Sequence, residues 1–156
     1  MLYINYDDLE TGKYEEYYMW EGKPFTGIGF DLHKNGQIAS EIEIVDGFEE
    51  GTIRKWYPSG KIRLEGYGRL GERYSWSKEW FENGNLKCEI LAEYHVLVKK
   101  KVWNEQGEIV SEYERPSLDR DLIESSRKQE LRLIIRRKEA GNHPLSKSED
   151  SDKTPG

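Results

Sequence analysis

The sequence predicts a mainly β protein: an elongated single sheet of stacked antiparallel β-hairpins, followed by a capping α-helix and a disordered tail. Three observations lead to this fold class. A glycine recurs at spacings of 24, 24 and 23 residues, turn-forming residues surround it, and hydrophobicity alternates after it. A period in the twenties is typical of repeat proteins, in which each repeat is one supersecondary unit. The recurring glycines are Gly36, Gly60, Gly84 and Gly107.

Each recurring glycine lies in a predicted hairpin turn. The four turn segments read HKNGQ, YPSGK, FENGN and NEQGE. Asn-Gly and Pro-Ser-Gly favour tight turns, because glycine adopts positive φ without a steric cost. An aromatic or β-branched run precedes the turns, as in residues 52–57 and 74–81. We therefore interpret each repeat of about 24 residues as one β-hairpin.

The residues after each turn alternate between two predicted faces of a strand. Ile62 and Leu64 would point one way, and Arg63 and Glu65 the other. A glutamate follows each turn glycine after five residues: Glu41, Glu65, Glu89 and Glu112. Glutamates of neighbouring hairpins would stack about 10 Å apart, so we expect Arg63 and Lys87 to offset their repulsion. Two interpretations stay open: the glutamates space the repeat, or they form a repeated ligand comb.

The segments WYPSGKIRLE and WFENGNLKCE, with EGKPFTG upstream, resemble the MORN-repeat variant of bacterial YwqK-type antitoxin proteins. The resemblance covers about residues 18–114 and departs from the pattern most in the last copy, where Asn104 replaces an aromatic residue. It implies an antitoxin or immunity protein that binds one bacterial toxin domain. The family has no catalytic motif, so the resemblance implies no catalytic residue.

The two ends of the chain differ from the repeats. The opening segment MLYINYDDLETG is predicted to be a strand or hairpin, and residues 1–115 form the repeat domain. Residues 116–141 begin with a capping serine and acids and end with basic residues before Gly141, which is the polarity of a helix. We expect this helix to cover the open end or one face of the sheet. Residues 142–156 are polar and predicted to be disordered.

Composition indicates one small domain without a large core. Hydrophobic residues make up 35% of the 156 residues, and charged residues another 35%. The lone Cys88 has no partner for an internal disulfide, and we interpret it as a small buried filler. One cysteine, no leader-like start and no long apolar segment favour a cytoplasmic location. We expect no cofactor.

The sequence contains no enzyme motif, and we expect neither a catalytic nor a metal site. His33, His95 and His143 are isolated from one another and from ligand-spaced cysteines or carboxylates. The serines lack the context of a nucleophile elbow. The pair Gly27 and Gly29 precedes a strand rather than a helix, so it does not indicate a phosphate loop.

Negative charge is concentrated at the start of the chain. Residues 1–50 contain twelve acidic residues and three lysines, a net charge of −9 within a whole-chain charge of −6. This acidity disfavours nucleic-acid binding. It favours a partner with a basic surface, such as a toxin that is a nuclease or deaminase, because an acidic inhibitor can mimic the charge of its substrate. Solvation of an exposed sheet is the other interpretation. The candidate toxin contacts are Glu15, Glu16, Glu21, Asp46, Glu49 and Glu50.

A second functional hypothesis is a non-enzymatic scaffold that binds another protein or a membrane surface. It depends on the basic, amphipathic segment RKQELRLIIRRK at residues 127–138. No basic patch elsewhere supports a membrane site, so the capping helix is the favoured interpretation of this segment. The sequence leaves open the toxin's identity, the sheet face that binds it, and the oligomeric state.

Overall fold

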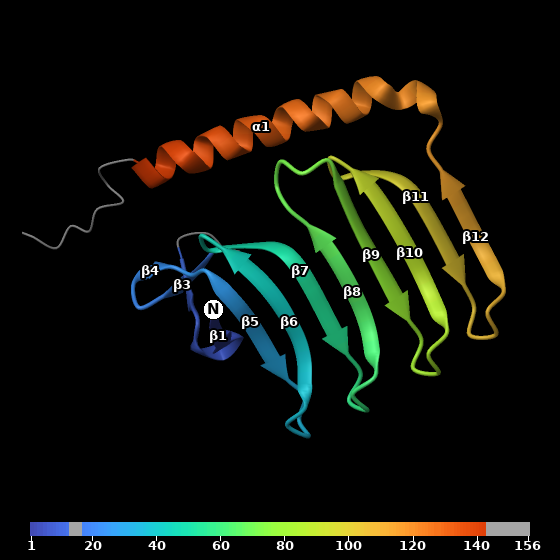
Figure 1. The fold of residues 1–156 in the computed structure, drawn as a ribbon, viewed down its shortest axis with the longest axis horizontal. Helices are drawn as coiled ribbons and strands as arrows, with labels where there is room; N and C mark the ends of the chain where they lie inside the picture. The colour runs from blue at the N-terminus through green and yellow to red at the C-terminus, as the bar shows by residue number, and fades with distance from the viewer. Residues whose placement is uncertain (13–16, 143–156) are drawn as a thin grey trace, which may run out of the picture.

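The computed structural model describes residues 1–12 and 17–142, and it confirms the predicted fold class. A long sheet of nine strands dominates the molecule, with a small sheet of three strands beside its N-terminal part. One long helix runs along the side of the sheet formed by the upper ends of the strands (Figure 1). The small sheet is an addition to the single sheet that the sequence predicts.

The long sheet has the strand order β1-β5-β6-β7-β8-β9-β10-β11-β12, so successive strands from β5 onward are neighbours. All of these neighbours are antiparallel, whereas β1 is parallel to β5. The strands are β1 Leu2–Asn5, β5 Gly27–Leu32, β6 Ile38–Val45, β7 Phe48–Trp56, β8 Ile62–Gly68, β9 Tyr74–Trp80, β10 Leu86–Glu93, β11 Val96–Trp103 and β12 Ile109–Glu114. The small sheet consists of β2 Glu10–Thr11, β3 Tyr18–Trp20 and β4 Lys23–Pro24.

The four recurring glycines lie in equivalent turns, which form a row at one end of the strands of the long sheet. Their φ angles are +83°, +84°, +90° and +85° in chain order, a conformation that glycine adopts readily. Each turn closes with the same two backbone hydrogen bonds, such as Phe81 N–H to Asn85 O and Gly84 N–H to Phe81 O. Side chains link neighbouring turns, because Asn83 donates to Glu105 O and Tyr57 donates to Trp80 O.

The turns at the opposite edge contain residues other than glycine at positive φ. Asp46 precedes Gly47 with φ of +50°, and the β10–β11 turn places Tyr94 at +46° and His95 at +62°. Two successive residues with positive φ are typical of the hairpin turn that matches strand twist. His95 therefore occupies a position for which glycine is the usual choice, and this turn needs support from outside the hairpin.

The small core lies where the N-terminal segment folds over the long sheet. Phe25 and Ile44 are almost completely buried there, together with Leu9. The 3-10 helix η1, Tyr6–Asp8, and the small sheet form the second layer of this core. The opening segment forms the strand β1, one of the two alternatives predicted for it. A low hydrophobic content agrees with a core confined to this end of the molecule.

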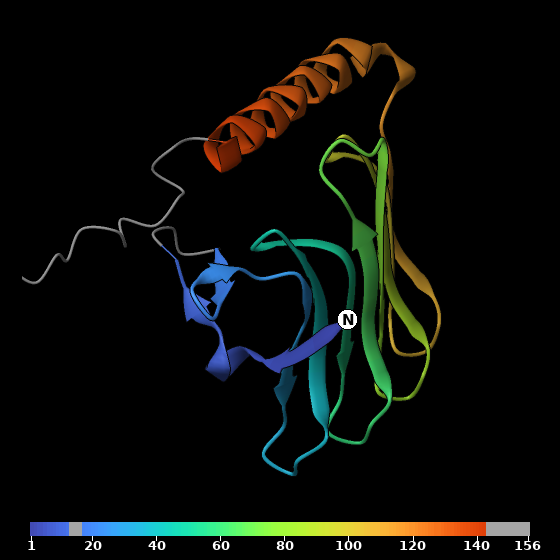
Figure 2. The ribbon, with the colours of Figure 1, turned by 60° about the vertical axis from the view of Figure 1, so that its left-hand side comes forward.

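Helix α1, Arg120–Asn142, follows the short 3-10 helix η2, Ser117–Asp119. Figure 2 shows that α1 lies over the ends of the strands, beside the turns that contain Gly71 and His95, and not flat on either face of the sheet. Glu130, which is 4% exposed, accepts a hydrogen bond from the Gly71 N–H at 3.0 Å. Its other oxygen lies 3.3 Å from His95 Nε2 without hydrogen-bond geometry. Ser126 donates to Tyr94 O at 2.5 Å, so α1 supports the turn with two non-glycine residues at positive φ.

The C-terminal part of α1 reaches the N-terminal half of the sheet. Arg137 forms an ion pair with Glu50 of β7, and its guanidinium lies 3.6 Å from the ring centre of Phe48. In the described residues, no helix is both long and apolar enough to span a membrane. The disordered tail was predicted to begin at residue 142, but α1 includes Asn142, and residues 143–156 lie outside the described part of the chain.

Candidate protein-binding surface

The four recurring glutamates lie in one cross-strand row. The strand register pairs Glu41 with Arg54, Glu65 with both Arg54 and Lys78, and continues in the same way to β12. Because directly opposed residues in a sheet point to the same side, this row defines one face, which we call the charged face. The row reads Glu41, Arg54, Glu65, Lys78, Glu89, Lys101 and Glu112 across β6 to β12.

Charges alternate in sign along this row, and ion pairs form between neighbours. Arg54 Nε lies 3.1 Å from a Glu65 carboxylate oxygen. The corresponding distance is 3.3 Å from Lys78 to Glu89 and 2.9 Å from Lys101 to Glu112. Exposed ion pairs contribute about 0–1 kcal/mol each, so the row adds little stability. Its larger effect is to set the charge pattern that a partner meets.

Arg63 and Lys87, which were predicted to offset the recurring glutamates, form no ion pair with Glu65 or Glu89 in the described structure. The ion pairs of Glu65 and Glu89 are formed with Arg54 and Lys78, which come from the preceding strand of each pair. Lys87 instead forms an ion pair with Glu79 at 2.9 Å, and this hydrogen bond raises the pKa of Lys87. The register shift between Leu86 and Cys88 places Lys87 outside the regular pairing.

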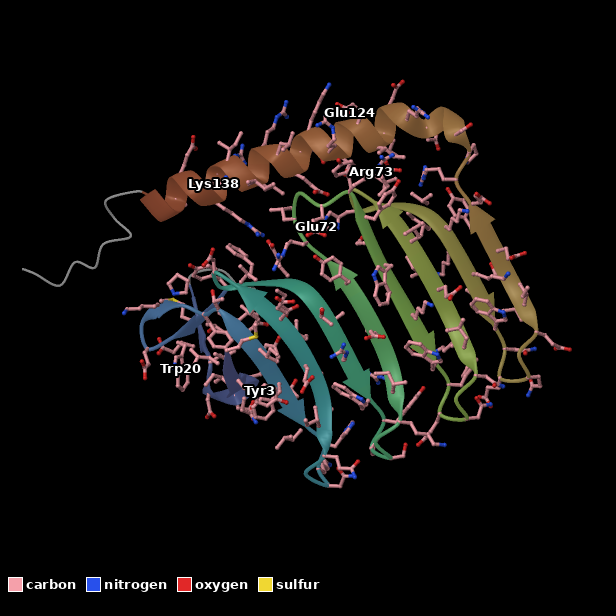
Figure 3. The ribbon with its side chains drawn as sticks, viewed as in Figure 1. Tyr3, Trp20, Glu72, Arg73, Glu124 and Lys138 are labelled. Carbon is pink, nitrogen blue, oxygen red and sulfur yellow. The ribbon has the colours of Figure 1, made fainter. Side chains whose placement is uncertain are left out.

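The N-terminal end of the row is closed by a tyrosine. Tyr3 of β1 donates a hydrogen bond of 2.6 Å to Glu41 and stacks on Phe30 of β5. Partial burial and, next, this bond to the carboxylate raise the pKa of Tyr3 to about 12. Figure 3 labels Tyr3 beside the strands that begin the sheet. The C-terminal end of the row, at Glu112, has no such closing residue among the described parts of the chain.

A groove of about 550 Å³ lies over the C-terminal strands β9 to β12. Its lining includes Trp76, which is 38% exposed, and residues of the charged face such as Glu89, Lys99 and Lys101. Lys99 forms an ion pair with Glu114 at 3.0 Å, parallel to the pair of Lys101 with Glu112. An exposed tryptophan among paired charges is suited to contact a protein surface, because aromatic residues contribute strongly to interfaces.

The predicted toxin contacts are divided by the structure into different settings. Glu15 and Glu16 lie outside the described residues. Glu21 is exposed in the β3–β4 turn, and Asp46 is exposed in the β6–β7 turn. Tyr18 N–H donates to Gly47 O, and Asp46 N–H donates to Thr26 Oγ1, so the base of the β3–β4 hairpin, and not its turn with Glu21, lies against the β6–β7 turn.

The other two predicted contacts are engaged inside the molecule. Glu49 accepts hydrogen bonds of 3.1 Å from the hydroxyls of Tyr6 and Tyr18. Glu50 pairs with Arg137 of α1, and its side chain is only 16% exposed. Because their carboxylates already have internal partners, a change at either residue would disturb the fold as well as the surface.

The histidines and Cys88 were examined in the sequence as possible catalytic or metal-binding residues, and the described ones contact groups of the fold itself. His33 lies 2.9 Å from Trp56 O, and His95 faces Glu130, whereas His143 lies outside the described residues. Burial raises the pKa of the Cys88 thiol, which disfavours the reactive thiolate. Over residues 1–12 and 17–142, no group of three or more potential ligands could hold a metal ion.

Sequence reasoning missed the cations of the charged face, although a signal for them exists. Arg54, Lys78 and Lys101 recur at spacings of 24 and 23 residues, the same period as the turn glycines. The hydrogen bond between Glu130 and the Gly71 N–H could not be predicted in this way, because one glutamate in a helix rich in charged residues does not indicate its partner.

Comparison with known proteins gives one informative match. The chain is 33% identical over 114 residues to the protein described as immunity protein YwqK of Bacillus subtilis (strain 168). The alignment covers 72% of this chain and 74% of that protein. No family model and no solved structure matches the chain. The description of the repeats as the MORN type therefore stays a prediction.

Proposed function

The chain belongs to the family of immunity protein YwqK, and from this premise we propose that it is an immunity protein. It binds a cognate bacterial toxin domain and blocks the toxin's active site by occlusion. The observation that carries the proposal is the identity of 33% over most of both chains. The proposed role is non-enzymatic and cytoplasmic, and it requires no cofactor.

The fold supports occlusion as the mode of inhibition. A sheet whose strands are linked by regular turns offers a preformed surface, so little conformational entropy is lost on binding. Glu21 and Asp46 expose their side chains in the β3–β4 and β6–β7 turns, both in the acidic N-terminal part of the molecule. A toxin that acts on nucleic acid has a basic groove, and acidic groups on an inhibitor attract and orient such a surface.

The proposal is tested first by recovering the partner. The tagged chain is used to capture proteins from its source cell, and those retained after a high-salt wash are identified by mass spectrometry. We expect one stoichiometric toxin-like protein, which stops growth when expressed alone and does not when co-expressed with this chain. A captured partner whose toxicity is unchanged by co-expression would refute the immunity role.

The charge contribution is tested with exposed residues only. The double variant Glu21→Lys with Asp46→Lys reverses two exposed acidic groups that form no ion pair in the described structure; Asp46 Oδ1 accepts one long hydrogen bond, of 3.5 Å, from Thr26 Oγ1. We expect its association rate with the toxin to fall about tenfold at low salt and to depend less on salt. Glu105→Lys, in a turn at the opposite edge, is the matched control. An unchanged association rate of the double variant would refute charge mimicry and leave occlusion standing.

A second candidate function, a membrane-proximal scaffold, is favoured by exposed apolar side chains of α1, which lie along two sides of the helix. Leucine and isoleucine side chains of this helix are about half exposed and lie among basic residues. These side chains are Leu122, Leu131, Leu133 and Ile135. Such a helix can bind an anionic lipid surface through its apolar side chains and its charge. Sedimentation with phosphatidylserine vesicles, lost on deletion of residues 117–156, would support this function. Absence of sedimentation by the full chain would exclude it.

A further inference from the structure

We infer that the outer edge of β12 is the site at which the toxin adds a strand, and that this strand places a lysine or arginine beside Glu112. The inference rests on the proposed immunity function and specifies how the partner is recognised. Strand addition to an open sheet edge combines backbone hydrogen bonds, which give affinity, with side-chain pairing, which gives specificity.

The edge of β12 is open in the described structure. Among the strands of the described residues, β12 pairs with β11 alone, and all six of its residues are exposed. The apolar side chains of Ile109, Val110 and Tyr113 are 50%, 59% and 40% exposed. Proteins commonly protect a terminal edge with lysine, proline within the strand, or a covering segment. The charged residues of β12 are the two glutamates Glu112 and Glu114; it contains neither lysine nor proline, and α1 crosses the ends of the strands and not this edge (Figure 1).

The backbone of β12 offers two residues to an incoming strand. Arg115 N–H donates to Val98 O at 2.8 Å, so the amide of residue 115 points toward β11. Backbone groups of successive residues in a strand point to opposite sides. The N–H and C=O groups of Glu112 and Glu114 therefore point outward, away from β11. A strand that bonds to these groups would continue the antiparallel sheet by one position.

The alternating charges of the charged face indicate which type of side chain the added strand would place beside Glu112. Within the row, Glu65 lies between Arg54 and Lys78, and Glu89 lies between Lys78 and Lys101. Glu112 has Lys101 on one side and, among residues 1–12 and 17–142, no cation on the other. The alternation therefore ends with a carboxylate that is 60% exposed and has one of its two neighbouring positions vacant. A basic side chain in the added strand would fill this position.

A second copy of this chain is a poor occupant of the same edge. Two β12 strands related by a two-fold axis would keep their charged faces on one side, which brings Glu112 and Glu114 of both copies together. Like charges directly opposed across strands are destabilising. Pairing of β12 with β1 of another copy brings no cation either, since β1 reads LYIN. The charge pattern thus favours a foreign, basic strand.

The experiment measures amide hydrogen exchange by NMR in the free chain and in the complex with the captured toxin domain. We expect the amides of Glu112 and Glu114 to exchange rapidly in the free chain and at least about tenfold more slowly in the complex. A complex that leaves both amides unprotected would overturn the inference without affecting the proposed function. Protection in the free chain that rises with its own concentration would overturn it in favour of self-association. Absence of any neutralising complex would refute the proposed function, and this inference with it.

Two pairs of variants separate the contribution of the Glu112 charge to toxin binding from that of the backbone N–H of residue 114. Glu112→Lys should weaken toxin binding about tenfold or more, whereas Glu82→Lys, the same charge reversal at an exposed residue of the β9–β10 turn, should leave it within about twofold. Glu114→Pro removes an outward N–H, and Glu114→Gln keeps it. We expect the proline variant to bind much more weakly than the glutamine variant, with similar melting temperatures of the free proteins. Equal affinities within both comparisons would overturn the inference.

Discussion

At the scale of single residues, Glu130 connects α1 to the sheet. Its replacement by alanine removes the carboxylate that accepts from the N–H of Gly71, a residue of an exposed loop, and removes the contact with His95. We expect Glu130→Ala to lower the free energy of unfolding by about 1.5–3 kcal/mol, the usual contribution of a hydrogen bond to a charged group. Urea unfolding measures this change. The control Glu139→Ala changes an exposed glutamate of the same helix and should cost less than about 0.5 kcal/mol. Equal effects of the two changes would contradict this role.

Because of Tyr6, we expect the free energy of unfolding to fall as the pH rises into the alkaline range. Burial, and next the charge of Glu49, raise the pKa of its hydroxyl above the ordinary value of 10.0. Because the folded pKa is higher than the unfolded one, the stabilisation is fully present below pH about 10 and is lost as the pH rises further. We expect Tyr6→Phe to be less stable by about 1 kcal/mol at pH 7, owing to the lost hydrogen bond. It should lose less stability than the wild type between pH 9 and pH 11. Parallel urea-derived stability profiles would contradict this expectation.

At the scale of elements, each repeat depends on its turn glycine. Gly84 has φ of +90°, and no heavy atom lies within 4 Å of the position that a Cβ would occupy. Gly84→Ala therefore tests the backbone alone, and we expect a loss of about 1–2 kcal/mol in the free energy of unfolding. Gly84→Asn should lose less, because asparagine tolerates positive φ better than alanine. A similar stability of the two variants would show that the backbone conformation does not determine the cost.

The elements that the sequence predicts well are those set by local chemistry. The four turns follow from glycine at positive φ, and Glu65 and Glu89 share one face as expected, but a register shift interrupts the regular pairing at Arg63 and Lys87. Pairing between hairpins was harder to predict, because the register there depends on the second set of turns, including Tyr94 and His95, which lack a glycine. The parallel pairing of β1 and the internal partners of Glu49 and Glu50 depend on contacts between distant segments. A sequence pattern within one repeat contains no record of such contacts.

At the scale of the whole molecule, α1 adds contacts that a linear array of repeats lacks. In such an array each repeat contacts its neighbours only, so local openings are independent of distant ones. Helix α1 reaches the β10–β11 turn, the loop at Gly71 and residue Glu50 of β7. The ion pair of Arg137 with Glu50 joins residues 87 positions apart in the chain. The helix therefore links the local unfolding of several hairpins at the ends of the strands that it contacts.

This coupling predicts an asymmetric effect of removing the helix. A chain that ends at Pro116 loses the acceptor of the Gly71 N–H and the support of the Tyr94–His95 turn. We expect hydrogen exchange to accelerate at residues 69–73 and 94–95 and to stay unchanged at the turns of Gly36 and Gly60. Those turns lie at the opposite edge and close with their own backbone bonds. Mass spectrometry of peptides from both edges measures the contrast. Equal acceleration at both edges would show that α1 holds the whole sheet together, whereas no acceleration would show that its contacts do not limit local opening.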